Sequence, residues 1–320
     1  MGRQARMLSS NVGAAEGTFF SQERFIRAVA RVETPNVRVL KLQSANSPAH
    51  LFGLEYTRTH NRRSVSLAPF GLPAYPAGAG QLQETIPTLL RQLKTPRTTG
   101  FEWNVRFDHN DLAKQLDDSG LTRIEGTTHV LRIDRPYDNL FRGFSETARN
   151  LVRRAERDGI VVCRATEHLE IDRYYSLYEK MIAGRVNWKF VYKQSLFHEL
   201  FKIRECVILL LSKLDGIVIG GGWFIRDGDS LFYWQGAMDY EYKRYSPNYA
   251  IVNSAIRYAS EERIASFNMG ASGAISTLEQ FKSIWGTVKL PHWTFAWQNP
   301  MWLFLSRWRT RMRTRHLKWD

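Results

Sequence analysis

The chain has 320 residues, 43% of them hydrophobic and 13% aromatic, which is enough to build the core of two domains or of one large one. Its formal net charge of +14 favours anionic partners such as RNA, phosphorylated substrates or acidic lipid. Cys163 and Cys206 are isolated from each other and from any histidine cluster, which argues against a disulfide framework and a structural zinc site. The N-terminus lacks the apolar run of a signal peptide, and no segment has about twenty unbroken apolar residues, so we expect a cytoplasmic protein without a membrane span.

The first half of the chain alternates helical and strand patterns around one irregular segment. Phe25, Ile26 and Val29 line one side of a short amphipathic helix over 21–32. Glycine and proline recur from 70 to 80, which predicts a surface loop. The other expected elements are strands at 37–42, 49–56, 101–106 and 127–133 and helices at 85–94 and 110–119.

The second half repeats this mixture. Asp215-Gly216 is a tight-turn dipeptide between two apolar runs and predicts a β-hairpin. Ser246 before Pro247 predicts a helix start, because serine caps a first turn and proline is tolerated at its first position. The expected helices are 145–159, 169–183, 194–202, 249–262 and 275–285, and the expected strands are 160–165, 206–214, 217–226, 230–238, 265–269 and 290–296.

Two successive units of similar composition predict an α/β fold with mixed sheets and a duplicated domain. The duplication depends on element order, because no residue-level internal repeat accompanies it. The expected divisions are a flexible N-terminus over 1–18, a first domain over 19–134, a second domain over 135–298 and a basic amphipathic tail over 299–320.

Three stretches of the sequence resemble one superfamily when they are taken in order. They are 128–133, the basic segment 148–162, and Asn268-Met269-Gly270 followed by Phe281-Lys282 and Gly286. Together they resemble the Fem-type (FemAB-like) aminoacyltransferases of the GNAT-fold acyltransferase superfamily and their relatives in Gram-negative polysaccharide and exosortase gene clusters. The resemblance covers residues 19–298 and implies tandem GNAT-like domains of the acyl-CoA N-acyltransferase fold.

The resemblance implies a catalytic role for Phe281-Lys282. In Fem-type enzymes the matching lysine lies near the carbonyl of the donor ester and stabilises the developing oxyanion, an effect worth about 10²–10³ in rate for one good donor. Asn268, at the end of the preceding strand, is expected to bind substrate. The alternative is that Phe281 belongs to the core and Lys282 is a solvated helix charge.

An arginine stripe on one helix predicts a phosphate contact. Arg149 and Arg153 are four residues apart and Arg154 follows, so their guanidinium groups are expected to bind the phosphate of the acceptor or of tRNA. The alternative is a solvated basic face that Glu146 and nearby acids partly neutralise.

The strands of the second half carry further candidate residues. Triple glycine at 220–222 indicates close approach by a backbone or a ligand, or a bulge that serves only the fold. In GNAT-like folds the next strand separates from its neighbour to admit the donor, so Trp234 and Gln235 are expected in the substrate pocket. Asp239 and Glu241 are expected to contact the acceptor amine.

The segment before Pro247 bears on the donor. GNAT acetyltransferases place a glycine-rich loop here, whose N–H groups hold the pyrophosphate of CoA. Residues 243–250 contain no glycine, and proline removes one donor, which favours aminoacyl-tRNA over acyl-CoA. No Ser-His-Asp order, carboxylate pair or metal-ligand cluster stands out, so we expect no permanently bound cofactor and direct attack by an acceptor amine.

The tail over 301–320 mixes tryptophan with arginine, as suits an anionic membrane surface; RNA backbone or packing on the protein are the alternatives. Taken together, the sequence predicts a transferase that moves an acyl or aminoacyl group to an amine of an anionic, phosphorylated or lipid-linked cell-envelope or polysaccharide precursor. The expected partners are this precursor, tRNA and the inner face of the cytoplasmic membrane. The rivals are an acyl-CoA-dependent N-acetyltransferase acting on a sugar intermediate, and a non-catalytic relative that binds RNA or membrane.

Overall fold

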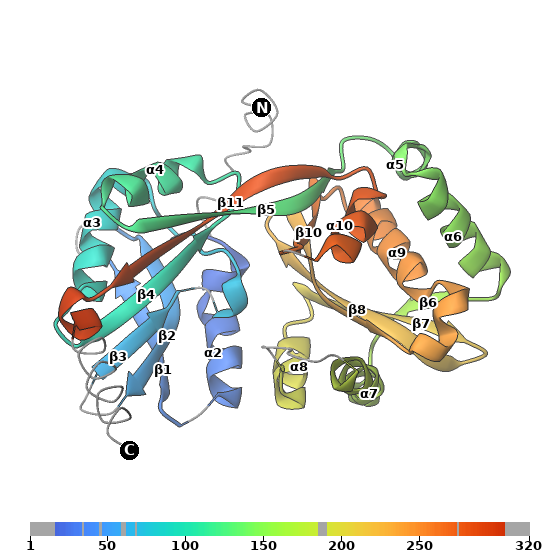
Figure 1. Ribbon diagram of the computed structural model, residues 1–320, viewed down its shortest axis with the longest axis horizontal. Helices are drawn as coiled ribbons and strands as arrows, with labels where there is room; N and C mark the ends of the chain where they lie inside the picture. The colour runs from blue at the N-terminus through green and yellow to red at the C-terminus, as the bar shows by residue number, and fades with distance from the viewer. Residues whose placement is uncertain are drawn as a thin grey trace, which may run out of the picture. The chain divides into compact units, whose positions relative to one another are not determined.

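The structure is a computed structural model, and it describes residues 17–304 except 34, 45–46, 59–61, 68, 185–190 and 274. The chain divides into two compact units (Figure 1). Unit 1 comprises residues 1–125 and 292–320, and unit 2 comprises residues 126–291. The expected boundary at 134/135 lies farther along the chain than this division, and residues 292–298 return to the first unit.

Unit 1 is a five-stranded mixed sheet with helices. The strands follow the order β1-β2-β3-β4-β11, in which only the β3–β4 pair is parallel. Its core joins the sheet to α3 and α4 and includes the fully buried Trp103 and Phe295. The elements are η2 (Phe19–Ser21), α2 (Glu23–Val32), β1 (Val37–Gln43), β2 (His50–Arg58), β3 (Arg62–Ser66), η4 (Pro69–Gly71), α3 (Leu82–Leu93), β4 (Thr98–Val105), α4 (Asn110–Asp118) and β11 (Val288–Gln298), which enters from unit 2.

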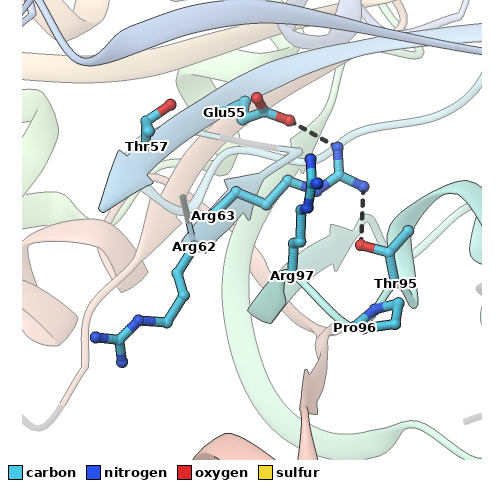
Figure 2. Close-up of a pocket in the computed structure, with 7 residues that line it drawn as sticks. All are labelled: Glu55, Thr57, Arg62, Arg63, Thr95, Pro96 and Arg97. Atoms are coloured by element: carbon cyan, nitrogen blue, oxygen red, sulfur yellow. Dashed lines mark hydrogen bonds and ion pairs between the residues drawn. The ribbon is translucent and has the colours of Figure 1, made fainter. Parts of the chain in front are cut away.

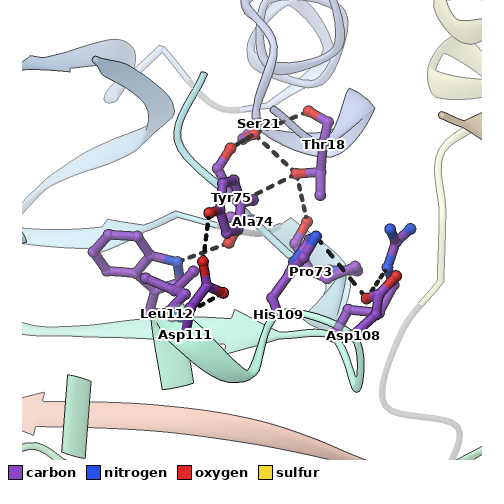
Figure 3. Close-up of polar contacts among 11 residues, drawn as sticks. Thr18, Ser21, Pro73, Ala74, Tyr75, Asp108, His109, Asp111 and Leu112 are labelled. Atoms are coloured by element: carbon purple, nitrogen blue, oxygen red, sulfur yellow. Dashed lines mark hydrogen bonds and ion pairs between the residues drawn. The ribbon is translucent and has the colours of Figure 1, made fainter. Parts of the chain in front are cut away.

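The glycine- and proline-rich segment of unit 1 is a packed element rather than a free surface loop. Beyond the end of β3, Ala74 continues the pairing on the same edge of β4, since its N–H donates to the Asn104 carbonyl at 2.9 Å. Trp103 Nε1 donates to the Ala74 carbonyl at 2.9 Å (Figure 3). Thr18 is buried and donates to the Pro73 carbonyl, although the sequence placed it in a flexible N-terminus. Residues 1–16 lie outside the described part of the chain.

Unit 2 has a six-stranded mixed sheet in the order β5-β10-β9-β8-β7-β6, in which the β10–β9 pair is parallel. The hairpin predicted at Asp215-Gly216 is confirmed: both residues have positive φ, 50° and 80°, as a type I′ turn requires. The elements are β5 (Thr122–Arg132), which enters from unit 1, α5 (Tyr137–Gly143), α6 (Glu146–Arg157), β6 (Val161–Arg164), α7 (His168–Ala183), α8 (Gln194–Phe201), β7 (Val207–Leu214), β8 (Ile217–Asp227), β9 (Ser230–Met238), η5 (Tyr240–Tyr245), α9 (Pro247–Glu261), β10 (Ser266–Ala271) and α10 (Ser276–Ser283).

The triple glycine lets helices approach both faces of the unit 2 sheet. A Cβ added at Gly221 would lie 2.5 Å from the Tyr174 ring of α7, and one at Gly222 would lie 2.9 Å from Ile251 of α9. Consecutive residues of a strand face opposite sides, so α7 and α9 cover opposite faces, as Figure 1 shows. The glycines therefore accommodate the protein's own side chains.

The start of α9 differs from the expectation in one respect. Pro247 occupies the first helical position as predicted, but the Ser246 side chain makes no capping hydrogen bond. Ser246 instead adopts a left-handed conformation with φ of 58°. The backbone turn that reverses the chain after η5 thus replaces the expected side-chain cap.

Element order and pairing repeat between the units. Each has a helix, a meander of three antiparallel strands, a helix, a strand parallel to the last meander strand, and another helix. In unit 1 the meander is β1-β2-β3 and the parallel strand is β4; in unit 2 they are β7-β8-β9 and β10. This repeated topology supports the duplication that the sequence predicted.

Candidate active site

The strands β9 and β10 separate near the middle of the unit 2 sheet. Their parallel pairing covers Ser230–Ser266, Leu231–Phe267 and Phe232–Asn268 and then stops. β9 continues to Met238 along β8, while β10 ends at Ala271. The separation between the two strands begins where the sequence predicted it, just before Trp234.

Asn268 shapes the end of β10. Its Oδ1 accepts from the Gly270 N–H at 2.8 Å and from Thr128 Oγ1 at 2.7 Å, and the residue is buried. Gly270 has a φ of 71°, which a glycine adopts without strain, and the register against β5 shifts there. Asn268 therefore holds a bulge in place, while its proposed contact with substrate stays a prediction.

Lys282 lies against this bulge. Its Nζ donates to the carbonyl of Gly270 at 3.0 Å and to that of Ala271 at 2.7 Å, and only 4% of the residue is exposed. Burial lowers the pKa of the ammonium group to about 8. An ammonium group has three N–H donors, so two remain with the strand end and one is left for an oxyanion.

His129 is a neighbour of Lys282 that sequence reasoning treated as structural. Its Nδ1 lies 3.3 Å from Thr287 Oγ1, and that hydroxyl donates to the Lys282 carbonyl at 2.9 Å. Burial, and then the charge of Lys282, lower the pKa of His129. The alternation of β5 and a helix end far along the chain create this pairing, so no local motif could have indicated it.

Phe281 packs in the core of unit 2. Its ring lies edge-on to Tyr249 at 5.5 Å and to Trp285 at 6.2 Å between centroids. These contacts fix the orientation of α10 and, through it, the position of Lys282. A direct part for Phe281 in catalysis stays a prediction.

Trp234 is the extra residue of a β-bulge, because Trp223 pairs with Gln235 and Phe224 with Tyr233. Its ring contacts Tyr192 and Phe197, with centroids 4.9 and 5.6 Å away. The half-buried Gln235 directs its amide to the Gly236 carbonyl at 3.4 Å. Both predicted pocket residues thus lie on the part of β9 beyond the last pair with β10.

The two predicted acidic contacts differ in their surroundings. Asp239 accepts from the Glu241 N–H at 3.1 Å and forms an ion pair with Lys180 at 3.2 Å. Glu241 is exposed at the start of η5. An acceptor amine at Asp239 would therefore compete with a lysine of the protein.

The three predicted arginines of α6 have different environments. Arg149 donates to the carbonyls of Arg142 and Phe144, which end the preceding helix. Arg153 lies over the Phe141 ring at 5.6 Å, and the exposed Arg154 pairs with Asp158 at 3.4 Å. Arg149 thus has a structural partner set, whereas Arg153 and Arg154 present cations at the surface, where ion pairs contribute little stability.

The start of α9 offers few backbone donors to a pyrophosphate. The Ser246 N–H donates to the Lys243 carbonyl at 3.1 Å, and those of Tyr249 and Ala250 to the Ser246 carbonyl at 3.0 and 3.4 Å. Pro247 has no N–H. Of residues 246–250, only Asn248 keeps an N–H without a backbone acceptor in the described chain.

Two further properties concern the described residues as a whole. No group of three or more histidine, cysteine or acidic side chains is arranged to hold a metal ion among them. No helix in the described ranges has the length and apolar character needed to cross a bilayer.

Comparisons with known proteins agree with this geometry. Residues 142–283 match the family model of the acetyltransferase (GNAT) domain. None of the curated protein sequences is significantly similar to the chain.

Solved structures resemble both units together. FemX has a TM-score of 0.68 at 14% identity, covering 90% of this chain and 94% of FemX. L-PGS from Bacillus licheniformis has a TM-score of 0.60 at 12% identity, covering 91% of this chain and 98% of that one. The C-terminal domain of a putative lysylphosphatidylglycerol synthetase from Agrobacterium fabrum has a TM-score of 0.56 at 14% identity, covering 89% of this chain and 94% of that one. The protein thus carries a GNAT acyltransferase domain within a Fem-like fold.

Proposed function

We propose that the protein transfers an aminoacyl group, or another acyl group, from a donor ester or thioester to an amine of an anionic cell-envelope or polysaccharide precursor. The observation that carries this proposal is the buried Lys282 ammonium group at the point where β9 and β10 separate. A preorganised cation in a site of low exposure stabilises an oxyanion more strongly than water does.

The reaction needs no nucleophile from the enzyme. The acceptor amine attacks the carbonyl carbon of the donor, a C–N bond forms, and the bond from carbon to the donor oxygen or sulfur breaks. The amine loses a proton, and the leaving group gains one. Lys282 would donate its third N–H to the carbonyl oxygen as negative charge develops, while Trp234 and Gln235 on β9 would line the space for the reacting groups.

Aminoacyl-tRNA is the donor we favour. A CoA pyrophosphate is usually held by several convergent N–H groups at a helix start. At α9 most of these groups are occupied by backbone acceptors or removed by Pro247. The structural likeness to FemX and L-PGS is compatible with this choice.

The second candidate is an acyl-CoA-dependent N-acetyltransferase that acts on a sugar or polysaccharide intermediate. The match of residues 142–283 to an acetyltransferase family model favours it. Such an enzyme would hold CoA in a pose that does not depend on the start of α9.

The acceptor phosphate and the cellular site are parts of the same proposal. Arg153 and Arg154, exposed on α6, are the residues we assign to a phosphate of the precursor or of tRNA. We place the protein at the inner face of the cytoplasmic membrane, where lipid-linked precursors would be within reach. The predicted amphipathic tail over 305–320 lies outside the described residues, so its part in this location depends on the sequence alone.

The donor is tested with the purified full-length protein and amine-bearing envelope precursors. The protein is incubated with tRNA carrying a radiolabelled amino acid or with radiolabelled acetyl-CoA, and label in the precursor is measured. We expect transfer from tRNA. Transfer from acetyl-CoA alone would establish the second candidate, and no transfer from either donor would contradict both and favour a non-catalytic relative.

A further inference from the structure

Unit 1 contains a basic hollow that includes none of the candidate catalytic residues. Its volume is about 420 Å³, and its lining includes Glu55, Arg62, Arg63, Arg97 and the Thr95–Pro96 turn (Figure 2). Three arginines against one glutamate give the lining a formal net charge of +2. A hollow of this charge selects an anionic ligand.

Arg63 is the fixed member of this set. Its guanidinium donates to Glu55 at 2.7 Å, to the Gln92 carbonyl at 2.7 Å and to Thr98 at 3.0 Å. These bonds neutralise Glu55 within the protein and hold the floor of the hollow in place. The charge left for a ligand therefore comes from Arg62 and Arg97.

The two remaining arginines lie on different sides of the hollow. Figure 2 shows Arg62 extending away from Arg63, while Arg97 lies beside it. Arg97 is exposed, and its guanidinium has no hydrogen bond or ion pair with any other described side chain. Arg62 stacks on the Trp302 ring at 4.7 Å, which leaves the donors of a planar guanidinium directed along its edge.

The chain after β11 is fastened to the same turn. Asn299 is buried, and its Nδ2 donates to the Thr98 carbonyl at 3.1 Å. Trp302 Nε1 donates to the Pro96 carbonyl at 2.9 Å. Residues 300–304 are helical and expose two apolar side chains, Met301 at 48% and Phe304 at 68%. Exposed apolar groups and cations are thus held in a fixed relation by hydrogen bonds.

We propose that Arg62, Arg97, Trp302, Met301 and Phe304 form a docking site for an anionic phospholipid surface. A headgroup phosphate would enter the hollow between the arginines, and Met301 and Phe304 would enter the boundary between headgroups and acyl chains. Arginine beside tryptophan and other apolar groups is the composition that binds anionic interfaces. This site is separate from acyl transfer and does not depend on the proposed donor.

The exposed apolar pair favours lipid over RNA as the partner. Phosphate contacts alone explain arginines, but they give no advantage to an exposed Met301. A bilayer uses both parts of the site at once, because charge attracts it and apolar area anchors it. RNA binding is accordingly an outcome of the test rather than a part of the proposal.

The test is vesicle co-sedimentation with the full chain. The vesicles contain phosphatidylglycerol and phosphatidylcholine in equal parts, with phosphatidylcholine alone as the reference. Losing Arg62 and Arg97 in the variant R62Q/R97Q should weaken binding about twentyfold. The matched control R38Q/R91Q removes two exposed arginines of unit 1 outside the hollow and should weaken binding less than threefold.

Further arms separate the sources of phosphate and the parts of the site. Phe304→Ser should weaken vesicle binding about tenfold and leave the binding of inorganic phosphate unchanged. Each variant is also tested for binding of a labelled single-stranded RNA, and its unfolding midpoint confirms that it is folded. The proposal is overturned if R62Q/R97Q matches its control on vesicles, if Phe304→Ser has no effect, or if R62Q/R97Q reduces RNA binding more than vesicle binding.

Discussion

The two units share a topology but treat the end of their parallel strand pair differently. In unit 1, β3 ends at Ser66, and Pro73–Tyr75 continues the pairing along β4 through Ala74 and Asn104. In unit 2, the pairing of β9 with β10 stops at Phe232 and Asn268, and β9 goes on without β10. The same fold therefore has a closed strand pair in one unit and an open one in the other.

The polar groups at these strand ends show how each state is stabilised. Thr18 and Ser21 hold Tyr75 through its backbone N–H and carbonyl, at 3.1 and 2.9 Å (Figure 3). In unit 2, the side chains of Asn268 and Lys282 bind the backbone of Gly270 and Ala271 instead. A loop closes the first pair and leaves no room for substrate, whereas two side chains stabilise the second and leave an edge of β9 for chemistry.

Replacing Lys282 should give the largest difference between the units. Lys282→Met removes the cation at the open strand pair, and we expect the transfer rate to fall about 10²–10³-fold, equivalent to roughly 3–4 kcal/mol. Lys114→Met is the matched control, because Lys114 lies exposed on α4, the counterpart of α10 in unit 1. Equal rates in wild type and Lys282→Met, measured under single-turnover conditions, would show that the lysine is structural.

The closed pair of unit 1 should weaken in acid through His109. Burial lowers the pKa of His109 to about 4, and the group faces Arg106, Asp108 and Asp111. Between pH 6.5 and 4 the unfolded chain binds this proton and the folded chain does not. The free energy of unfolding should therefore decrease as pH falls through this window, by about 3 kcal/mol from this group.

His109→Gln isolates that effect. The difference in unfolding free energy between wild type and variant, measured by urea titration from pH 7 to pH 4, should shift in favour of the variant as pH falls. Parallel curves over this range would mean that His109 takes up its proton in the folded protein as readily as in the unfolded one.

Tyr75 tests the loop that closes unit 1. Its hydroxyl donates to Asp111 Oδ2 at 3.0 Å, a hydrogen bond to a charged group. Tyr75→Phe should lower the free energy of unfolding by about 2 kcal/mol without changing the transfer rate. Tyr245→Phe is the control, because that hydroxyl bonds only an exposed arginine. A large loss of rate in Tyr75→Phe would assign unit 1 a part in the chemistry.

Much of the fold follows from local patterns in the sequence. The hairpin at Asp215-Gly216 and the helix that begins at Pro247 depend on turn and cap preferences, and the structure has both. The short strand β3 and the helix α5 were not predicted, because five and seven residues give too little periodicity. The closing segment around Ala74 was read as a surface loop, since its contacts are with residues about thirty positions away.

The candidate site was predictable in part. The Phe281-Lys282 motif and the separation of β9 from β10 follow from the family resemblance, and the structure places Lys282 at that separation. The bulge at Trp234, the Lys180–Asp239 ion pair and the proximity of His129 to Lys282 arise from tertiary packing. Single residues such as Arg149 also found partners that helix spacing could not reveal, since the partners belong to the preceding turn.

The pH dependence of transfer tests the part of Lys282 most directly. The single-turnover rates of wild type and Lys282→Met are measured from pH 6 to 9.5, and their ratio is taken because it cancels titration of the acceptor and the donor. With a pKa of about 8, the ammonium form declines above that pH, so the ratio should be constant below pH 8 and fall towards tenfold per pH unit above it. A ratio that rises through pH 8 would make the neutral amine a general base, and a ratio that stays at one would remove Lys282 from the reaction.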